Sequence, residues 1–418
     1  MVFTARTMWL LGAIAMGTLL VPTLVGAVVF VVTAAVAAGD AWAVRAVPET
    51  VRTAPPILSR GVPGRLSAST THPNTRLRQS VASPDLRVEP AEATGRLDAT
   101  ILARRRGEHR LARLATLRTG PLGLGGWYHL AGDTHDITVY PDMPAASRLA
   151  TEVRLGLFRE EGRRARGPLG LGTELEAIRE YQPDDDIRQV NWRATARTGH
   201  PMSNTYRIEQ DRDVLCLLDC GRLMASPLTR EDGARLTRLD AAVDAVAAVA
   251  AVADELGDRI GVVAFADRLL RSVAPRRDGS AAVVAAIHDL EPIGTDSDYQ
   301  SAIGAVASRK RAFILVLTDL LDPAAARTLV ASIPALTRHH TVAVATVRDP
   351  AVAHALGTES ADELELARTV VAADVALRRM EVTAQLTERG AGVIDAEVDV
   401  LSRRCVGSYV RAKRLARV

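Results

Sequence analysis

The sequence predicts three parts in order: N-terminal transmembrane helices, a small β-sandwich, and a three-layer α/β domain around a mostly parallel sheet. Three observations support this. The chain opens with a long uncharged apolar run, continues with short alternating segments, and then alternates between helical and strand-like segments. With 418 residues it also exceeds the roughly 250 to 300 residues that one hydrophobic core organises. Several domains are therefore expected.

The composition indicates a globular protein and excludes some functions. Hydrophobic residues make up 48% and charged residues 24%, as in ordinary folded domains. The net charge is only +3, and the only lysines are Lys310 and Lys413, so no nucleic-acid partner is expected. Cys216, Cys220 and Cys405 show no metal-binding spacing and are expected to be reduced, buried and structural.

The N-terminal run is long enough to enter a membrane. No charged residue lies between Arg6 and Asp40, and the run is about twice as long as the apolar region of a signal peptide. Pro22 near its middle favours a helical hairpin over one long tilted span. We therefore expect residues 1–46 to form a membrane anchor, with legs of about 18 residues between Thr7 and Val44.

The flanking charges predict the orientation of this anchor. In a hairpin, Arg6 at one end and Arg45 and Arg52 at the other stay on the same side. Because positive residues favour the cytoplasmic side, the soluble domains are expected to face the cytoplasm from the plasma membrane. Asp40 must then lie at the membrane interface.

Residues 47–145 are expected to form a small antiparallel β-sandwich, because short alternating stretches are separated by turn residues. The predicted strands are Arg65 to Ser69, Leu86 to Glu89, Arg96 to Ala103, His109 to Leu117 and Asp136 to Tyr140. Two interpretations of the arginines at 104–106 and Arg110 stay open: contact with acidic lipid headgroups, or a solvated basic face.

Residues 213–418 are expected to form the α/β domain, because brief apolar strands alternate with helical segments. Leu269 to Ala274 follows a strand after a short turn and predicts an antiparallel edge. The predicted parallel strands are Val214 to Leu218, Ile260 to Phe265, Phe313 to Leu317, Val342 to Thr346 and Gly392 to Ile394. The predicted helices are Leu239 to Leu256, Ala281 to Leu290, Tyr299 to Ser308, Ala324 to Leu336, Ala361 to Arg389 and Val398 to Leu415.

Four of these strands run into an aspartate within a few residues. These are Asp219, Asp267, Asp319 and Asp349. Ligands of open α/β sheets bind at the carboxyl ends of the strands, and hard oxygen ligands suit Mg²⁺. Asp219 and Asp319 form the best pair, with a hydroxyl from Thr295 or Ser297 nearby. Alternatively, the aspartates cap the helices that follow.

Residues 146–212 are expected to form a charged segment that leads into the α/β domain, with the densest charge between Arg179 and Arg197. Asp184, Asp185 and Asp186 precede Arg188, and if Asn191 to Arg197 is helical, two arginines share one face. One hypothesis is a docking site for an acidic partner. Its residues would be Arg179, Glu180, Tyr181, Asp186, Arg188, Trp192, Arg193 and Arg197. The alternative is an internal ion network with Trp192 in the core.

The same segment carries a family resemblance. Residues 172–197 read GTELEAIREYQPDDDIRQVNWRATAR, and LLDCGRLM follows at Leu217 to Met224. Together with PLGL at Pro121 to Leu124 and VYPD at Val139 to Asp142, they resemble the bacterial family called domain of unknown function 58. The resemblance covers nearly the whole chain. It implies a Rossmann-like domain of the von Willebrand factor A-like type, and a partner ATPase of the AAA type, MoxR class.

The resemblance also implies a degenerate metal site. A von Willebrand A site uses Asp-x-Ser-x-Ser, a threonine and a later aspartate, which correspond here to Asp219, Thr295 and Asp319. Gly221 and Leu223 replace both serines, and Arg222 adds a positive charge that opposes a cation.

Enzymatic catalysis has little support in the sequence. The chain contains no Gly-x-Ser-x-Gly motif and no phosphate-binding loop. We therefore expect a membrane-anchored protein-protein interaction scaffold with no catalytic residues and no small-molecule substrate. The alternative from another class is a metal-dependent hydrolase centred on Asp219 and Asp319.

Overall fold

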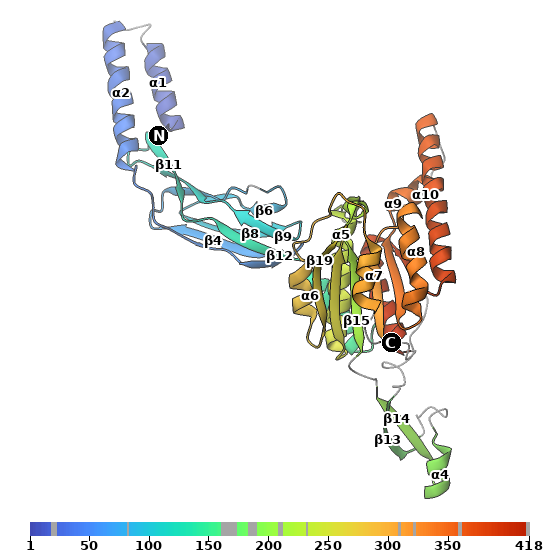
Figure 1. The fold of residues 1–418 in the computed structure, drawn as a ribbon. Helices are drawn as coiled ribbons and strands as arrows, with labels where there is room; N and C mark the ends of the chain where they lie inside the picture. The colour runs from blue at the N-terminus through green and yellow to red at the C-terminus, as the bar shows by residue number, and fades with distance from the viewer. Residues whose placement is uncertain are drawn as a thin grey trace. The chain divides into compact units, whose positions relative to one another are not determined.

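The computed structural model describes residues 1–17, 23–81, 83–159, 174–182, 190–207, 212–230, 233–307, 311–320, 323–357 and 362–414. The chain divides into two compact units, Met1–Tyr140 and Pro141–Val418. Figure 1 shows that the first unit combines a pair of helices with β-sheets, and that the second is an α/β fold.

The β-rich part of the first unit contains three sheets. The strand orders are β2-β4-β8-β6, β1-β11-β10-β5-β7 and β3-β12-β9. The strands are β1 (Val2–Phe3), β2 (Thr50–Thr53), β3 (Ile57–Ser59), β4 (Gly64–Thr70), β5 (Thr75–Arg78), β6 (Leu86–Glu89), β7 (Glu92–Thr94), β8 (Arg96–Ala103), β9 (Gly107–Leu111), β10 (Leu114–Thr119), β11 (Gly125–Ala131) and β12 (His135–Tyr140).

The three sheets share one hydrophobic core, to which alternate residues of most strands contribute, among them Leu66, Leu97 and Ile137. Two expectations were wrong in detail. The single strand predicted from His109 to Leu117 is two strands, β9 and β10, in different sheets. The sheets are not wholly antiparallel, because β12 pairs parallel with β3.

Two apolar helices, α1 (Ala5–Gly17) and α2 (Thr23–Ala43), lie in the chain between β1 and β2 and are side by side in Figure 1. Over the described residues, one helix, Leu24–Ala43, is long and apolar enough to cross a membrane. The 13 residues of α1 extend only about 20 Å, less than the roughly 30 Å of a bilayer core. The two helices of the predicted hairpin are present, but its equal legs of about 18 residues are not.

Both ends of this helix pair are fixed to the same edge of the β-rich part. β1 pairs antiparallel with β11, with Val2 opposite Gly126. Asp40, near the end of α2, is 5% exposed and accepts hydrogen bonds of 2.9 Å from the backbone N–H groups of Leu122, Leu124 and Gly125. The PLGL motif therefore forms the loop that holds α2.

The second unit is built on a six-stranded sheet of order β19-β18-β15-β20-β21-β22. All its neighbours are parallel except the edge strand β19, which is antiparallel as predicted. The strands are β15 (Asp213–Asp219), β18 (Arg259–Phe265), β19 (Leu269–Arg276), β20 (Ala312–Leu317), β21 (Thr341–Val347) and β22 (Gly392–Ala396).

Helices cover both faces of this sheet. One face packs against α5 (Arg238–Glu255), α6 (Ser280–Ile287) and α11 (Val398–Arg414), and the other against α7 (Tyr299–Ala307), α8 (Pro323–Thr337) and α10 (Glu363–Glu388). A further helix, α3 (Met143–Arg154), packs against α5 and α11. The predicted helix from Ala361 to Arg389 is α10. A short helix that was not predicted, α9 (Pro350–Gly357), precedes it.

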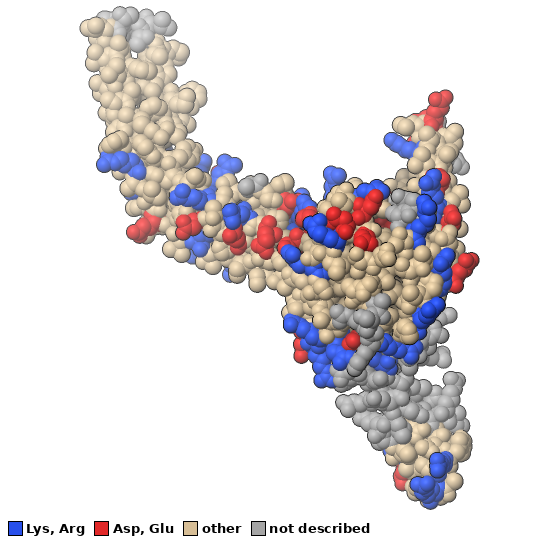
Figure 2. All heavy atoms as spheres, in the orientation of Figure 1, with Lys and Arg blue, Asp and Glu red and all other residues tan. Residues whose placement is uncertain are grey.

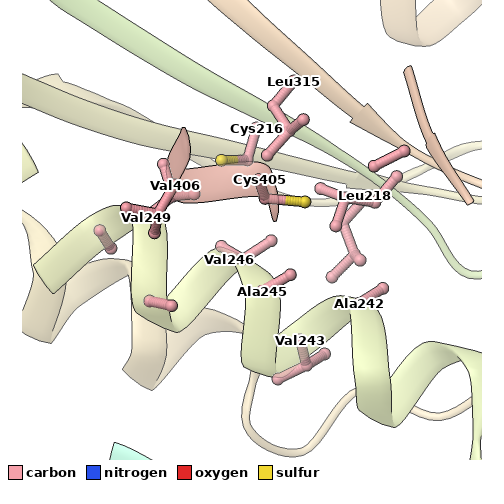
Figure 3. Close-up of a cluster of buried hydrophobic side chains, with 14 of the residues drawn as sticks. Cys216, Leu218, Ala242, Val243, Ala245, Val246, Val249, Leu315, Cys405 and Val406 are labelled. Atoms are coloured by element: carbon pink, nitrogen blue, oxygen red, sulfur yellow. The ribbon is translucent and has the colours of Figure 1, made fainter. Parts of the chain in front are cut away.

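The Ala- and Val-rich helix α5 packs closely on the sheet, as its composition predicts. Figure 3 shows Ala242, Val246 and Val249 of this helix beside Cys216 and Cys405. Small side chains let the helix approach the strands closely. All three cysteines are buried and form no disulfide within the described residues, which agrees with the predicted structural role.

A smaller structure, the charged hairpin, consists of β13 (Glu174–Glu180), α4 (Trp192–Thr198) and β14 (Met202–Arg207). β13 and β14 pair antiparallel. A 3-10 helix, η2 (Arg222–Ala225), and the short paired strands β16 (Pro227–Thr229) and β17 (Arg235–Thr237) lead into α5.

Candidate functional site

The carboxyl edge of the sheet brings Asp219 and Asp319 to the same end. β15 and β20 are parallel neighbours, with Leu218 opposite Leu317. Asp219 is the last residue of β15, and Asp319 lies two residues after β20. The strand order reverses between these two strands, which is where open α/β sheets form a crevice.

The Asp219 carboxylate is saturated by hydrogen bonds. One oxygen accepts from the Gly221 backbone N–H at 2.8 Å and from the Ser297 hydroxyl at 2.5 Å. The other accepts from the Thr318 hydroxyl at 2.6 Å and from the Tyr299 hydroxyl at 3.1 Å. Because each carboxylate oxygen has two lone pairs, all four acceptor positions are filled.

Tyr299 completes this network. Its hydroxyl lies 2.7 Å from that of Thr318. Burial raises the pKa of Tyr299 well above its ordinary value, and the nearby negative charge of Asp219 raises it further. The phenol therefore stays protonated and remains a donor.

Gly221, which stands where the metal motif has a serine, leaves space for Ser297. A Cβ atom at position 221 would lie 2.1 Å from the Ser297 hydroxyl oxygen. Thr295, the threonine predicted for the site, is exposed, and its backbone carbonyl accepts from the Arg222 N–H at 2.9 Å. Over the described residues, the loop therefore supplies Ser297, and not Thr295, to Asp219.

Asp319 is neutralised by arginines. Its side chain is 1% exposed and lies 2.6 Å from the Arg238 guanidinium, which is 3% exposed. A second guanidinium nitrogen, on Arg379, lies 3.7 Å from the other oxygen. That nitrogen also donates to the Thr346 hydroxyl at 2.8 Å and to the Val347 carbonyl at 2.7 Å. No sequence pattern indicated either arginine, because Arg238 at the start of α5 and Arg379 on α10 lie far from Asp319 in the chain.

These residues do not fit a divalent cation. The acceptor positions of Asp219 are occupied by donors, and the two guanidinium groups beside Asp319 would repel a metal ion. The described part of the chain contains no group of three or more His, Cys, Asp or Glu side chains suited to a metal.

The other two strand-end aspartates have ordinary local partners. Asp349 accepts from the Ala351 N–H at 2.9 Å at the start of α9, which agrees with a capping role. Asp267 does not cap. It lies 3.2 Å from Arg268 at the surface.

The charged hairpin places its aromatic residue at the surface. The Asn191 side chain caps α4 by accepting from the Ala194 N–H at 2.9 Å, and Gly199 ends the helix with a φ of 80°. Trp192 is 71% exposed. The interpretation that places Trp192 in the core is therefore wrong.

The remaining docking-site residues surround this helix or fall outside the described residues. Arg193 and Arg197 are exposed on α4. On β13, Arg179 donates to the Glu180 carbonyl at 3.0 Å, and the Glu180 carboxylate lies 3.2 Å from His200. The Tyr181 N–H donates to the Pro201 carbonyl at 2.9 Å. Asp186 and Arg188 lie outside the described residues.

The fold defines a class of protein in which apolar helices and a β-rich part precede an α/β unit. At the carboxyl edge of its sheet, hydrogen bonds and ion pairs engage the carboxylates of Asp219 and Asp319. The chain belongs to the family described as "Protein of unknown function DUF58", whose model matches residues 177–386. The match therefore runs from the charged hairpin into α10.

Similar proteins are uncharacterized. Proteins of Mycobacterium bovis and Mycobacterium tuberculosis are 28% identical over 161 residues, which are 37% of this chain and 49% of theirs. The match thus spans about half the length of these relatives. A crystal structure titled as an uncharacterized membrane spanning protein from Vibrio fischeri shares 16% identity, covers 50% of this chain and 98% of its own, and has a TM-score of 0.18. At that score the likeness supports no conclusion.

Proposed function

We propose that this protein is a membrane-anchored protein-protein interaction scaffold and not an enzyme. Its α/β unit is von Willebrand factor A-like and faces the cytoplasm. Its partner is an AAA-type ATPase of the MoxR class, as the family resemblance implies. The observation that carries the proposal is the exposed tryptophan of the charged hairpin.

Trp192 is 71% exposed, so without a partner its large apolar ring stays in contact with water, which is unfavourable. Trp192 lies next to Arg193, and Arg197 follows one helical turn later, all exposed on α4. Tryptophan and arginine are the residues most enriched among those that dominate binding energy. This combination supports a docking surface for an acidic patch on the partner.

The carboxyl edge supports binding over catalysis. Asp219 accepts four hydrogen bonds, and Asp319 is paired with Arg238. A general base or metal ligand needs a free lone pair directed at a substrate. These carboxylates hold the carboxyl edge together instead, which suits a rigid recognition module.

The helix pair supports membrane attachment as a hairpin. Both its ends lie at one edge of the β-rich part, so a chain that enters the bilayer through α1 must return through α2. At the end of α2, Trp42 stacks edge-on with Trp127 at 6.4 Å and lies 4.3 Å from the Arg45 guanidinium. Tryptophan and arginine are typical of the cytoplasmic membrane interface.

The test is affinity capture of the full chain from native membranes. We expect an AAA-type ATPase to be recovered with the unaltered chain, and at least about tenfold less with Trp192→Ala or Arg193→Glu. Arg268→Glu is the matched control, because Arg268 is 69% exposed and lies outside the hairpin. Equal recovery with all variants would defeat the docking site.

A separate measurement distinguishes the scaffold from a metal-dependent hydrolase. Purified full chain is titrated with Mg²⁺ and assayed on phosphoesters. The scaffold predicts no turnover. Turnover that disappears in Asp219→Ala would overturn the proposal.

A further inference from the structure

A second surface of the α/β unit has the features of a binding site. Between α9 and α10 lies a cavity of about 340 Å³, the α9–α10 groove. Its walls include the apolar side chains of Val352, Leu356, Ala376 and Met380, and Arg379 and Asp395 also line it. The charged hairpin contributes no residue to it.

Two residues that line this groove each have a buried polar atom without a hydrogen-bond partner among the described residues. Arg379 is 7% exposed, and its Nε–H is buried without a hydrogen-bond partner. One carboxylate oxygen of Asp395, Oδ1, is likewise buried without a hydrogen bond, and it lies 4.0 Å from Nη2 of Arg379. A buried donor and a buried acceptor each cost about 1 to 3 kcal/mol when left unmatched. A ligand group that offers both an acceptor and a donor, such as a primary amide, would satisfy them.

Met380 also belongs to an apolar stripe along the exposed side of α10. Leu366, Val370, Ala373, Leu377 and Met380 follow one another at intervals of four, three, four and three residues. The four larger side chains are 55%, 61%, 64% and 67% exposed in chain order. This spacing is typical of a helix that packs along another helix.

The charge beside the stripe indicates which kind of helix fits. Asp374, Glu381 and Glu388 are seven residues apart, exposed, and next to the stripe on one side. Asp374 pairs with Arg378 of the same helix at 2.9 Å, so the negative charge of this flank rests on Glu381 and Glu388. Acidic side chains also gather at the first turn of α10, where Figure 2 shows them in red. A second copy of α10 would bring the same acidic flank, so pairing of two copies gains no attraction between charges. A partner helix with a basic flank would be attracted to the acidic flank of α10.

We propose that the α9–α10 groove binds an amphipathic helix of a partner protein, with an apolar seam against α10, a basic flank beside Glu381, and an Asn or Gln side chain in the cavity. The amide carbonyl accepts from Arg379 Nε–H, and the amide N–H donates to Asp395 Oδ1. The site is independent of the charged hairpin.

The experiment uses the purified full chain in detergent and fluorescent peptides designed as amphipathic helices. The probe has leucine at the seam positions, lysine on the flank and a central glutamine. The comparison peptides have glutamate on the flank or leucine in place of the glutamine. Fluorescence anisotropy should show binding of the lysine peptide at least about tenfold tighter than that of the glutamate peptide. Replacing the glutamine with leucine should weaken binding about fivefold or more.

The variants are matched on one helix. Leu377→Asp on the stripe should weaken binding at least about tenfold, and Val371→Asp less than about twofold. Val371 is 62% exposed, like Leu377 at 64%, but lies off the stripe. Glu381→Lys should reverse the preference between lysine and glutamate peptides. Ala353→Trp, at an exposed position lining the cavity, should block binding.

Several outcomes would overturn the proposal. These are equal effects of Leu377→Asp and Val371→Asp, no preference between the flanks, or loss of peptide binding in Trp192→Ala. If analytical ultracentrifugation shows that the chain is a dimer and that Leu377→Asp converts it to a monomer, the groove binds a second copy of the chain instead. Unchanged peptide binding in Trp192→Ala keeps this site separate from the charged hairpin.

Discussion

Asp319 is a carboxylate almost without contact with water, and its charge is balanced by Arg238 and Arg379. The free energy lost by removing these charges from water nearly equals the free energy gained from their mutual attraction. The cluster as a whole therefore adds little stability. Removing one partner is different, because it leaves a buried guanidinium without its counter-charge.

Asp319→Ala should therefore lower the free energy of unfolding by about 3 to 5 kcal/mol. Asp267→Ala, which removes a surface aspartate just after β18, should change it by less than about 0.5 kcal/mol. Denaturant unfolding of the two variants measures the difference. The double variant Asp319→Leu with Arg238→Met should regain part of the loss, and equal behaviour of the two single variants would contradict a buried charge cluster.

Cys216 lies in the core beside α5, and burial raises the pKa of its thiol from the ordinary 9.0 to about 12. Since the thiolate is the reactive form, iodoacetamide at pH 8 should leave Cys216 unmodified in the folded protein and modify it in denaturant. Because the folded pKa is raised, the associated stability is complete below about pH 9 and is lost as the pH rises towards 12. Mass spectrometry reads the labelling, and rapid native modification would show that this core opens.

At the scale of elements, the Asp40 side chain holds α2 against the β-rich part. It accepts hydrogen bonds from the backbone N–H groups of Leu122 and Leu124 in the loop before β11 and of Gly125, the first residue of β11. Close packing adds to this, since a Cβ at Gly125 would lie 2.2 Å from the Ala37 carbonyl oxygen. The aspartate that interrupts the apolar run therefore joins α2 to the β-rich part of the first unit.

Asp40→Ala should destabilise the first unit by about 2 to 4 kcal/mol, because hydrogen bonds to a charged group are lost. Gly125→Ala should also destabilise the first unit, because the added methyl group would push α2 away from β11. Thr33→Ala is the control, since among the described residues the Thr33 hydroxyl donates to the Val29 carbonyl of its own helix. Unfolding in detergent, followed by tryptophan emission near Trp42 and Trp127, checks this, and equal midpoints for Asp40→Ala and Thr33→Ala would refute it.

At the scale of the whole molecule, the pairing of β1 with β11 requires the N-terminus to lie on the same side of a membrane as the β-rich part. An N-terminal tag and a C-terminal tag should both be protected from protease added outside intact cells and cleaved after lysis. A tag cleaved only at the N-terminus would mean a single span and a different pairing of β1.

The sequence by itself determined the order of the parts and the six strands of the parallel sheet. Periodicity and apolar runs are local properties, and the strands predicted from them, including the antiparallel edge from Leu269, are present in the structure. It also placed Asp219 and Asp319 at one edge, because parallel neighbouring strands end on the same side.

Only the tertiary structure decided what those carboxylates contact. Arg238 is 81 residues before Asp319 and Arg379 is 60 residues after it, and no local pattern relates them. The choice of Ser297 over Thr295 depended on the space left by Gly221. The exposure of Trp192 depended on how α4 lies on its hairpin. Such contacts depend on the packing of distant segments, whereas strands and helices follow from short-range chemistry, which is why the sequence indicates the fold better than the site.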